Sequence, residues 1–501
     1  MAAETELKFR VPARKLKALE KPRIGGAKSG EPSTSDLVST YFDTAKHKLK
    51  RHGLTLRVRY DGHDYVQTIK SGAGPQFERG EWETELENDA FDLDKAEGSP
   101  LEGLASGGLR RKLKPVFETS VRRITVPLRT RQSEIELAID RGNTTAGHRS
   151  HPIQEIELEL KSGRVLDLFR VARALERRSD AELDLRSKAE RGYELTGNDQ
   201  HSIVSAESVA LDSGVTAGEA FRVIARSTFR HFSSNADAVR EGETEGVHQM
   251  RVGLRRLRAA ISLFSGILAT ASTEDVKAQL KWLTNALAPA RELDVFVKED
   301  IEPASHDVLL RRGGRAIRQE FSGRRDRAFA RARQAIDSQH YRSMLIDTMQ
   351  WIEAKQTIAA DDEGGPIGEF SAALLDRRLK KLRKDGRHVD ELSPRQRHKV
   401  RIKAKKIRYA IDFFESLFPG KQERKQLKRL SKHLKRIQDA LGSLNDFVAH
   451  RKLAVDAALK APHRRERDRA FASGVVLGRE EQAVKPLIKI AAQEMRRLKP
   501  S

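Results

Sequence analysis

The two halves of the chain differ in the spacing of their hydrophobic positions. Up to about residue 195, apolar and polar residues alternate between turn residues such as Asp61-Gly62, which predicts antiparallel β-strands. From about residue 215, apolar residues recur with a period of about 3.6, which predicts amphipathic helices. We therefore predict a multi-domain α+β protein with a β-rich first half and an all-α second half. The expected strands are 54–60, 65–70, 80–86, 133–140 and 154–160, and helices are expected at 13–20 and 163–179 within the first half.

The helical half contains an internal repeat. Residues 248–264 (HQMRVGLRRLRAAISLF) align without gaps to 398–414 (HKVRIKAKKIRYAIDFF), and 280–295 match 434–448. Duplication of one helical bundle is the simplest explanation. The polar, turn-rich stretch that precedes the helical half is predicted to be a linker. The predicted boundaries are 1–197 for the first domain, 198–212 for the linker and 213–495 for the second domain, with repeats at about 213–360 and 361–495.

Composition narrows the classes of protein. Of 501 residues 38% are hydrophobic, which suffices for packed cores. There is no cysteine, so disulfides and thiolate metal sites are excluded and a reducing compartment fits. The longest weakly polar run, AAISLFSGILATA, is too short to cross a bilayer, so we expect a soluble cytoplasmic protein with no membrane partner.

Positive charge is concentrated in the helical half. Residues 1–200 contain 36 basic and 33 acidic residues, whereas residues 201–501 contain 59 and 39. Such an excess predicts a polyanionic partner for the helical half. Nucleic acid is not favoured, because no recognisable nucleic-acid-binding module is present and aromatic residues near the basic helices are few.

In the β-rich half, charged residues occupy one parity of each strand. Glu4, Glu6 and Lys8 alternate with Leu7 and Phe9, and at least five other strands repeat the pattern. One explanation is a solvent-exposed face with cross-strand ion pairs. The other, which we favour, is a barrel with a charged interior. At about 4 Å and an effective dielectric constant near 20, two like charges repel by about 4 kcal/mol. Crowded cations therefore indicate a bound anion, and crowded carboxylates a bound divalent cation.

These motifs resemble the CYTH domains of the triphosphate tunnel metalloenzymes. The resemblance is carried by ETELKF (4–9), YFDT (41–44), LRVR (56–59), TIK (68–70), RGE (79–81), AIDRG (138–142), EIELEL (155–160) and SKAERGY (187–193). It implies an eight-stranded antiparallel tunnel barrel with flanking helices, which hydrolyses a linear triphosphate with Mg²⁺ or Mn²⁺. The glycine-rich stretches 25–30 and 72–74 lack the spacing of a phosphate-binding loop and are expected to be ordinary loops.

The resemblance also assigns roles to residues of the first half. The triphosphate would be held by Lys8, Arg57, Arg59, Lys70, Arg123, Lys188 and Arg191. The metal would be carried by Glu4, Glu6, Asp140, Glu157 and Glu159, with Glu155 and Glu81 as further candidates. The catalytic set is Glu4, Glu6, Lys8, Glu157 and Glu159. Lys8 would either protonate the leaving group or clamp a phosphate, and the sequence does not separate these roles.

The helical half carries two basic arcs with the same spacing. His248, Arg251, Arg255 and Arg258 fall within about 80° on a helix, and His398, Arg401, Lys405 and Arg408 repeat them. A solvated basic face is the ordinary explanation. The near absence of acidic residues and the recurrence of the arc instead favour a polyanion site, in which the histidines donate to phosphate. Arg256 and Lys406 are included as candidates in the same motif.

This half resembles CHAD domains, in which two related four-helix bundles are associated with binding of inorganic polyphosphate. The resemblance covers about 213–495 and rests on the paired basic helices with ALAPARELDV (286–295) and ALGSLNDF (440–447). The chain has Leu287-Ala288 where the family usually has Leu-Gly, and Arg291-Glu292 where it has Arg-Asp. Neither change alters the expected fold.

Together the two halves predict a metal-dependent inorganic triphosphatase whose helical domain captures polyphosphate, in the cytoplasm or at polyphosphate granules. A non-catalytic polyphosphate-binding protein is the first alternative. The second is another reaction in the same tunnel, the cyclisation of ATP or the hydrolysis of thiamine triphosphate. The sequence predicts no particular oligomeric state.

Overall fold

The protein divides into two compact units in a computed structural model. The first unit comprises residues 1–204 and 336–354, and the second comprises 205–335 and 355–501. The predicted domain boundaries remain a prediction. They differ from these units in one respect: residues 336–354 lie within the predicted helical domain but belong to the first unit. The structure describes residues 5–20, 24–71, 80–105, 107–197, 203–305, 311–359, 363–459 and 466–498.

The first unit is built on an antiparallel sheet of ten strands. Along the sheet the strands follow the order β10-β1-β9-β8-β7-β3-β4-β5-β6, and β2 pairs with β7 off this path. The strands are β1 (Thr5–Arg10), β2 (Lys28–Ser29), β3 (Ser33–Asp43), β4 (Leu54–Tyr60), β5 (Tyr65–Ser71), β6 (Gly80–Leu86), β7 (Lys114–Arg129), β8 (Glu134–Ala146), β9 (Arg149–Ser162) and β10 (Glu182–Leu183).

The five strands expected from the sequence correspond to β4, β5, β6, β8 and β9, but β8 and β9 are longer than predicted and, within the described residues, the sheet does not close. The prediction of an antiparallel β half is confirmed, and β4 coincides with the expected strand 54–60. In the part of the chain that the structure describes, the terminal strands β10 and β6 are not paired with each other, so the sheet has ten strands and is not a closed eight-stranded barrel.

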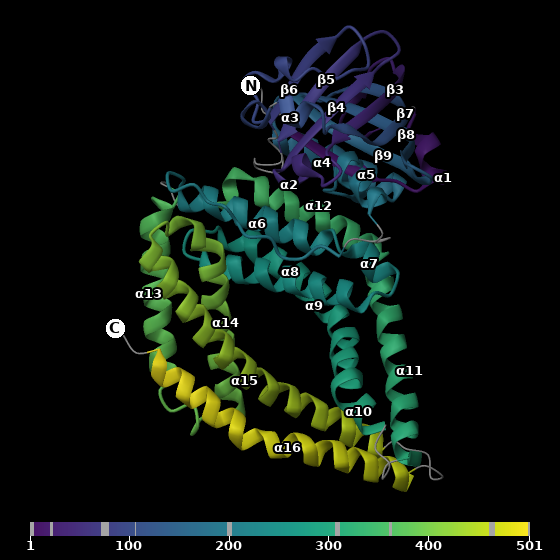
Figure 1. The fold of residues 1–501 in the computed structure, drawn as a ribbon. Helices are drawn as coiled ribbons and strands as arrows, with labels where there is room; N and C mark the ends of the chain where they lie inside the picture. The colour runs from purple at the N-terminus through teal and green to yellow at the C-terminus, as the bar shows by residue number, and fades with distance from the viewer. Residues whose placement is uncertain are drawn as a thin grey trace. The chain divides into compact units, whose positions relative to one another are not determined.

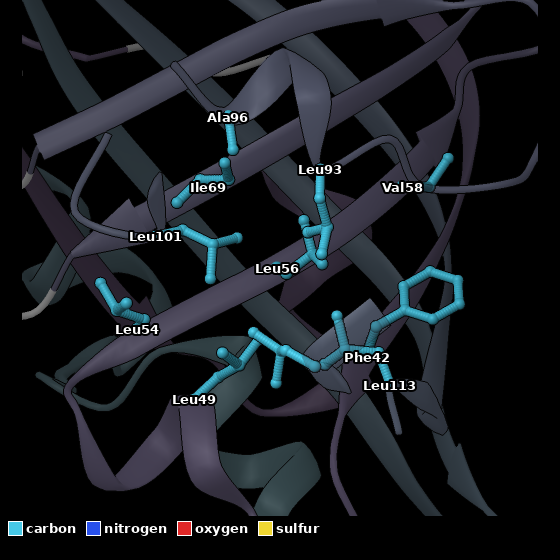
Figure 2. Close-up of a cluster of buried hydrophobic side chains, with 11 residues drawn as sticks. Phe42, Leu49, Leu54, Leu56, Val58, Ile69, Leu93, Ala96, Leu101 and Leu113 are labelled. Carbon is cyan, nitrogen blue, oxygen red and sulfur yellow. The ribbon is translucent and has the colours of Figure 1, made fainter. Parts of the chain in front are cut away.

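One face of the sheet is apolar and forms the core of the first unit. Leu56, Val58 and Ile69 are at most 3% exposed and pack with residues of the segments that follow β3 and β6. Figure 2 shows this cluster. Its members are Phe42, Leu49, Leu54, Leu56, Val58, Ile69, Leu93, Ala96, Leu101, Leu109 and Leu113. Full burial of such a side chain contributes about 1.5–3 kcal/mol, so the alternation of the sequence fixes which face of each strand is left for charged residues.

Short helices flank this sheet. Two more substantial helices matter for the site: α4, which begins two residues later than predicted, and α5, which begins with a capping box between Ser187 and Glu190. Helix α12 packs along α4, where Arg342 donates to Glu176 and Asp180. The helices of this unit are α1 (Ala13–Leu16), η1 (Lys17–Leu19), α2 (Lys48–Arg51), η2 (Asp94–Ala96), η3 (Glu102–Leu104), α3 (Gly107–Arg110), α4 (Val165–Ser179), α5 (Lys188–Thr196) and α12 (Gln339–Glu353).

The second unit is all-helical, as predicted. Its helices are α6 (Ala217–Ser233), α7 (Ala236–Arg240), α8 (Thr244–Leu263), α9 (Thr270–Phe296), the π-helical segment η4 (Val297–Ile301), α10 (Glu302–Ser305), α11 (Arg311–Ile336), η6 (Lys355–Thr357), α13 (Ile367–Asp385), α14 (Pro394–Phe414), η7 (Glu415–Leu417), α15 (Lys421–Leu459) and α16 (Glu466–Arg497). Capping boxes at Thr216 and Ser393 start α6 and α14. No described helix is both long and apolar enough to span a membrane.

The packing of the second unit follows the sequence repeat. Helix α8 packs between α6 and α9, and α14 packs between α13 and α15 in the same way. Helices α8 and α14, which carry the two basic arcs, also contact each other. The long helices α15 and α16 lie side by side (Figure 1). The repeat therefore brings two equivalent basic helices together, which the sequence alone did not predict.

Candidate functional sites

The polar face of the sheet carries rows of charged residues set by strand register. In one row Glu6 of β1 lies opposite Glu159 of β9, which lies opposite Glu136 of β8. In the next row Lys8 lies opposite Glu157, two residues further along. Because directly opposed side chains share a face, these residues form one continuous charged surface.

A buried network of opposite charges occupies the deeper part of this surface. Lys188, on the first turn of α5, forms ion pairs with Asp140 (2.7 Å), Glu157 (2.8 Å) and Glu155. Arg191, one turn later, also pairs with Glu155. A Cβ at Gly192 would collide with the ring of Phe117 on β7, so this glycine lets α5 approach the sheet closely enough for both cations to reach the carboxylates.

Arg123 and Lys8 extend the network across the sheet. Arg123 contacts Asp140 and Glu157 at 2.6 Å each, and Lys8 contacts Glu157 at 3.0 Å and Glu6 at 3.2 Å. Asp140, Glu155 and Glu157 are therefore each shared by two or more cations.

The pKa values of the network follow from this sharing. Burial alone would raise the pKa of Glu157, but Lys188, Lys8 and Arg123 outweigh it and hold that pKa well below its usual range. Burial would likewise lower the pKa of Lys8, but Glu157 and Glu6 raise it. The pKa of Lys188 is raised strongly by Asp140, Glu155 and Glu157 against the same cost of burial. These groups therefore remain charged over the physiological pH range.

The sheet curls so that its far strands share the polar interior. Lys70 on β5 pairs with Glu81 at 2.9 Å, while Arg57 lies 3.8 Å from the same carboxylate. Burial and the charge of Arg57 lower the pKa of Lys70, and Lys8 of β1 contributes to this lowering although five strands separate β1 from β5. Charges from opposite ends of the strand order thus face a common space.

The predicted triphosphate residues lie on this one charged surface or at its edge. Lys8, Arg57, Lys70, Arg123, Lys188 and Arg191 are at most 29% exposed and paired with carboxylates. Arg59 is nearer the rim, paired with the half-exposed Glu83 at 3.4 Å. Glu4 lies outside the described residues. Their assigned roles stay predictions.

Three residues at this surface were not among the predicted site residues. Glu136 lies in the same row as Glu6 and Glu159, and Lys161 pairs with Glu159 at 2.6 Å. Tyr41, 3% exposed, lies opposite Arg57 and, with Glu81, raises the pKa of Arg57 against the effect of burial. Glu136 shares the parity of Asp140 on β8, so strand alternation could have identified it.

The carboxylates fall into two sets that differ in how they could bind a divalent metal. In the inner set, oxygens of Asp140, Glu155 and Glu157 lie within 4.8 Å of one another, a donor set that suits Mg²⁺ or Mn²⁺. Lys188 contacts all three, so an ammonium already neutralises this set. In the outer row, Glu6, Glu159 and Glu136 stand abreast, and such like charges favour a cation between them. Oxygen donors for a divalent metal are therefore present in both sets, and in the outer row Lys8 lies beside Glu6 while Lys161 lies beside Glu159 and Glu136.

The second unit contains a cluster of cations where α8 meets α14. Burial lowers the pKa of Lys405 to about 6, with Arg255, Arg401, Arg408 and Arg251 adding to the shift. Burial and the charge of Arg255 lower the pKa of Arg251 to about 10. The two predicted arcs therefore converge, and we call this group, with His248 and His398, the α8–α14 cluster.

Several buried donors of this cluster lack acceptors, although Arg251 also donates through Nη1 to the carbonyl of Thr284 at 3.2 Å. Within the described residues, no ion pair with a carboxylate involves its arginines, and the buried Nε atoms of Arg251, Arg255, Arg401 and Arg408 have no hydrogen-bond acceptor. Nδ1 of His398 is unpaired in the same way. Buried donors without acceptors cost about 1–3 kcal/mol each, and an acceptor placed among them would offset that cost.

Two residues predicted with the arcs, Arg256 and Lys406, lie elsewhere. Arg256 is 4% exposed, donates to the carbonyl of Glu207 and lies over the ring of Phe413, so it has a structural role. Lys406 donates to Ser262, and Arg378 and Arg258 are among the cations that lower its pKa after burial. Helical geometry explains this separation, because residues adjacent in sequence point about 100° apart.

Two family models match the chain in succession. Residues 2–193 match the model of the CYTH domain, and residues 223–455 match that of the CHAD domain. The first match spans the sheet and α5, and the second includes both helices of the α8–α14 cluster.

A relative and a solved structure agree with these matches. An inorganic triphosphatase of Haemophilus influenzae is 34% identical over 173 residues, which are 33% of this chain and 47% of that protein. The chain thus spans about half the length of this curated relative. The crystal structure of a CHAD domain from the plant Ricinus communis is similar with a TM-score of 0.52 and 27% identity, covering 60% of this chain and 98% of that one.

Proposed function

The chain is a CYTH–CHAD protein, and from this premise we propose that its first unit hydrolyses inorganic triphosphate with a divalent metal while its second unit binds inorganic polyphosphate. The observation that carries the first part is the curled, charged face of the sheet. It presents cations of β1, β4, β5, β7 and α5 together with carboxylates of β1, β8 and β9 around one space. Such a surface suits a small, highly charged substrate that arrives with a metal.

In this proposal the cations bind the substrate. Lys8, Arg57, Lys70 and Arg123 donate to phosphate oxygens, which compete with the carboxylates that these cations contact in the free protein. The raised pKa of Lys8 keeps it protonated and makes it a weak acid, which favours the role of a fixed phosphate clamp over that of a proton donor. Fixed cations in a water-poor site stabilise the charge that spreads over the transferred phosphoryl group.

The carboxylates have complementary tasks. We assign the metal to Glu6 and Glu159, with Glu136 beside them, because Lys188 occupies the converging oxygens of Asp140, Glu155 and Glu157, and the outer carboxylates also orient the attacking water. A bound metal supplies Lewis-acid polarisation of the phosphoryl oxygens. Asp140, Glu155 and Glu157 hold Lys188, Arg191 and Arg123 in fixed positions, so their contribution is to position the cations.

The α8–α14 cluster supports the polyphosphate half of the proposal. A polyphosphate chain offers one acceptor group after another, which matches several unpaired donors contributed by two helices. Bringing the anion into contact with Lys405 and the neighbouring arginines removes their mutual repulsion. By analogy with nucleic acids, this binding should weaken steeply as salt concentration rises.

A substrate panel tests the proposal. Phosphate release is measured with the full chain from triphosphate, ATP and thiamine triphosphate, with Mg²⁺, with Mn²⁺ and with a chelator, and cyclic AMP is assayed in the ATP reactions. We expect release from triphosphate that the chelator abolishes. Faster turnover of ATP or thiamine triphosphate would assign another substrate, and no turnover of any would leave polyphosphate binding as the function.

A further inference from the structure

A second cationic site lies between α13 and α14, outside the α8–α14 cluster. A pocket of about 220 Å³ is bounded there by side chains of both helices. Its lining residues are Arg378, Lys381, Lys399, Ile402, Lys403, Lys406 and Ile407. Five of these seven side chains are cationic.

The pocket uses a different side of α14 from the polyphosphate cluster. At about 100° per residue, the cluster residues of α14 and the pocket residues of α14 are centred about 150° apart around the helix axis. The cluster contains Arg401 and Lys405, whereas the pocket contains Lys399 and Lys403. The same helix therefore presents two separate cationic surfaces.

Two cations of the pocket are held in place and two project freely towards it. Arg378 donates to the carbonyl of Ser262, and Lys406 donates to the hydroxyl of the same residue at 2.7 Å. Lys381 and Lys399 are exposed. Among the residues that the structure describes, the pocket cations have a single carboxylate partner, the Asp385 that pairs with Lys403.

The charge balance and the size of the pocket define its ligand. Five cations with one paired carboxylate leave a surplus that only an anion of several charges can offset. A volume of 220 Å³ is below the range of about 300–1,000 Å³ that is usual for drug-sized ligands. Two or three linked phosphates suit a space of this size.

We propose that the α13–α14 pocket is a binding site for a short inorganic phosphate chain, pyrophosphate or triphosphate, separate from the cluster that binds long polyphosphate. Arg378 and Lys406 form its fixed part, and Lys381 and Lys399 close over the ligand from the two helices. Ile407, 1% exposed, and Ile402 are the apolar residues of the lining.

Lysine footprinting on the full wild-type chain tests this site directly. Acetylation of each lysine is quantified by mass spectrometry with and without pyrophosphate, at constant ionic strength and without divalent metal. Only a neutral amine reacts, and a bound phosphate that raises a lysine pKa by about one unit slows its acetylation about tenfold. We expect slower acetylation at the four pocket lysines, Lys381, Lys399, Lys403 and Lys406, with no change at the exposed Lys425 and Lys428 of α15.

Three further arms distinguish this site from the α8–α14 cluster and from nonspecific anion binding. Arg251→Glu/Arg401→Glu, which disrupts the α8–α14 cluster, should leave the protection at Lys381 and Lys399 intact. Lys381→Gln/Lys399→Gln should abolish the protection of Lys403 and Lys406, while Lys425→Gln/Lys428→Gln should not. Triphosphate should protect at least as well as pyrophosphate, and orthophosphate or sulfate much less.

The proposal is overturned if all exposed lysines are protected equally, which would indicate general ion screening. It is also overturned if the cluster variant removes the protection, which would make the pocket part of the polyphosphate site, or if sulfate protects as well as pyrophosphate. These outcomes do not depend on whether the first unit hydrolyses triphosphate.

Discussion

Both units concentrate cations on one surface, but the cations of the sheet are paired with carboxylates, whereas the arginines of the α8–α14 cluster form no such ion pair with a described residue. Lys188 of the sheet unit contacts three carboxylates, and its pKa is raised strongly. Lys405 of the α8–α14 cluster is surrounded by arginines, and its pKa falls to about 6. Two buried lysines in one chain are thus shifted in opposite directions by their neighbours.

The difference corresponds to two kinds of task. A site that performs chemistry needs fixed charges before the substrate arrives, and internal pairing fixes them. A site that only binds a polyanion can leave its cations unpaired, because the ligand supplies the missing charge. The sheet unit is therefore stable with its charges in place, whereas the cluster is electrostatically incomplete without a ligand.

The same substitution at the two lysines should separate these cases. Lys188→Met leaves three buried carboxylates without their shared cation, and breaking such a buried arrangement costs about 3–5 kcal/mol in the free energy of unfolding. Lys405→Met removes a source of repulsion and should leave stability unchanged or increase it. Urea denaturation followed by the fluorescence of Trp82 and Trp351, which lie in the first unit, together with circular dichroism, measures both. Equal losses in the two variants would refute the distinction between the units.

Charge reversal in the α8–α14 cluster should remove polyphosphate binding. Arg251→Glu/Arg401→Glu replaces two cations, one from each helix, by anions, and we expect affinity for long-chain polyphosphate to fall at least about a hundredfold. Titration calorimetry measures the affinity. Lys425→Glu/Lys428→Glu has the same effect on net charge at an exposed face of α15 and is the matched control. A similar loss of affinity in the control would show that the cluster contributes no more to binding than ordinary surface charge does.

Polyphosphate binding should depend on pH through Lys405. Its pKa is about 6 in the free protein, against an ordinary value of 10.5, and a bound polyanion raises it. Between pH 8 and pH 6 binding therefore takes up a proton, and affinity should rise as pH falls, by at most about tenfold per pH unit, and level off below pH 6. Lys405→Arg, which stays protonated, should flatten this profile. Identical profiles for the two proteins would show that Lys405 does not titrate with binding.

Much of the β half could be predicted from the sequence because strand alternation has a period of two. That period places Glu6, Lys8, Glu157 and Glu159 on one face regardless of tertiary detail. It does not determine whether the edges of the sheet meet, because closure depends on curvature and on pairing between strands distant in the sequence. The sequence therefore predicted a closed eight-stranded barrel, whereas the structure has an open sheet of ten strands.

The helical half shows a different limit. Helical spacing identified the arcs around Arg251 and Arg401, but it could not indicate that α8 packs against α14 and buries Lys405 among arginines. Nor could it separate Lys406, which contacts Ser262 beside the α13–α14 pocket, from its neighbour in sequence. Contacts between helices far apart in the chain determine these environments. The same holds for residues 336–354, which belong with the sheet unit although they lie within the helical half of the sequence.

The most direct test of the central claim is phosphate release from triphosphate by three versions of the full chain. The wild type should hydrolyse triphosphate with Mg²⁺ or Mn²⁺, and Glu6→Gln, which removes a charge from the outer row, should lower kcat/KM at least about a hundredfold. Glu85→Gln, an exposed glutamate at the edge strand β6, should retain full activity. Equal rates in the wild type and Glu6→Gln would contradict the account, because the charged face of the sheet would then not be the site of hydrolysis.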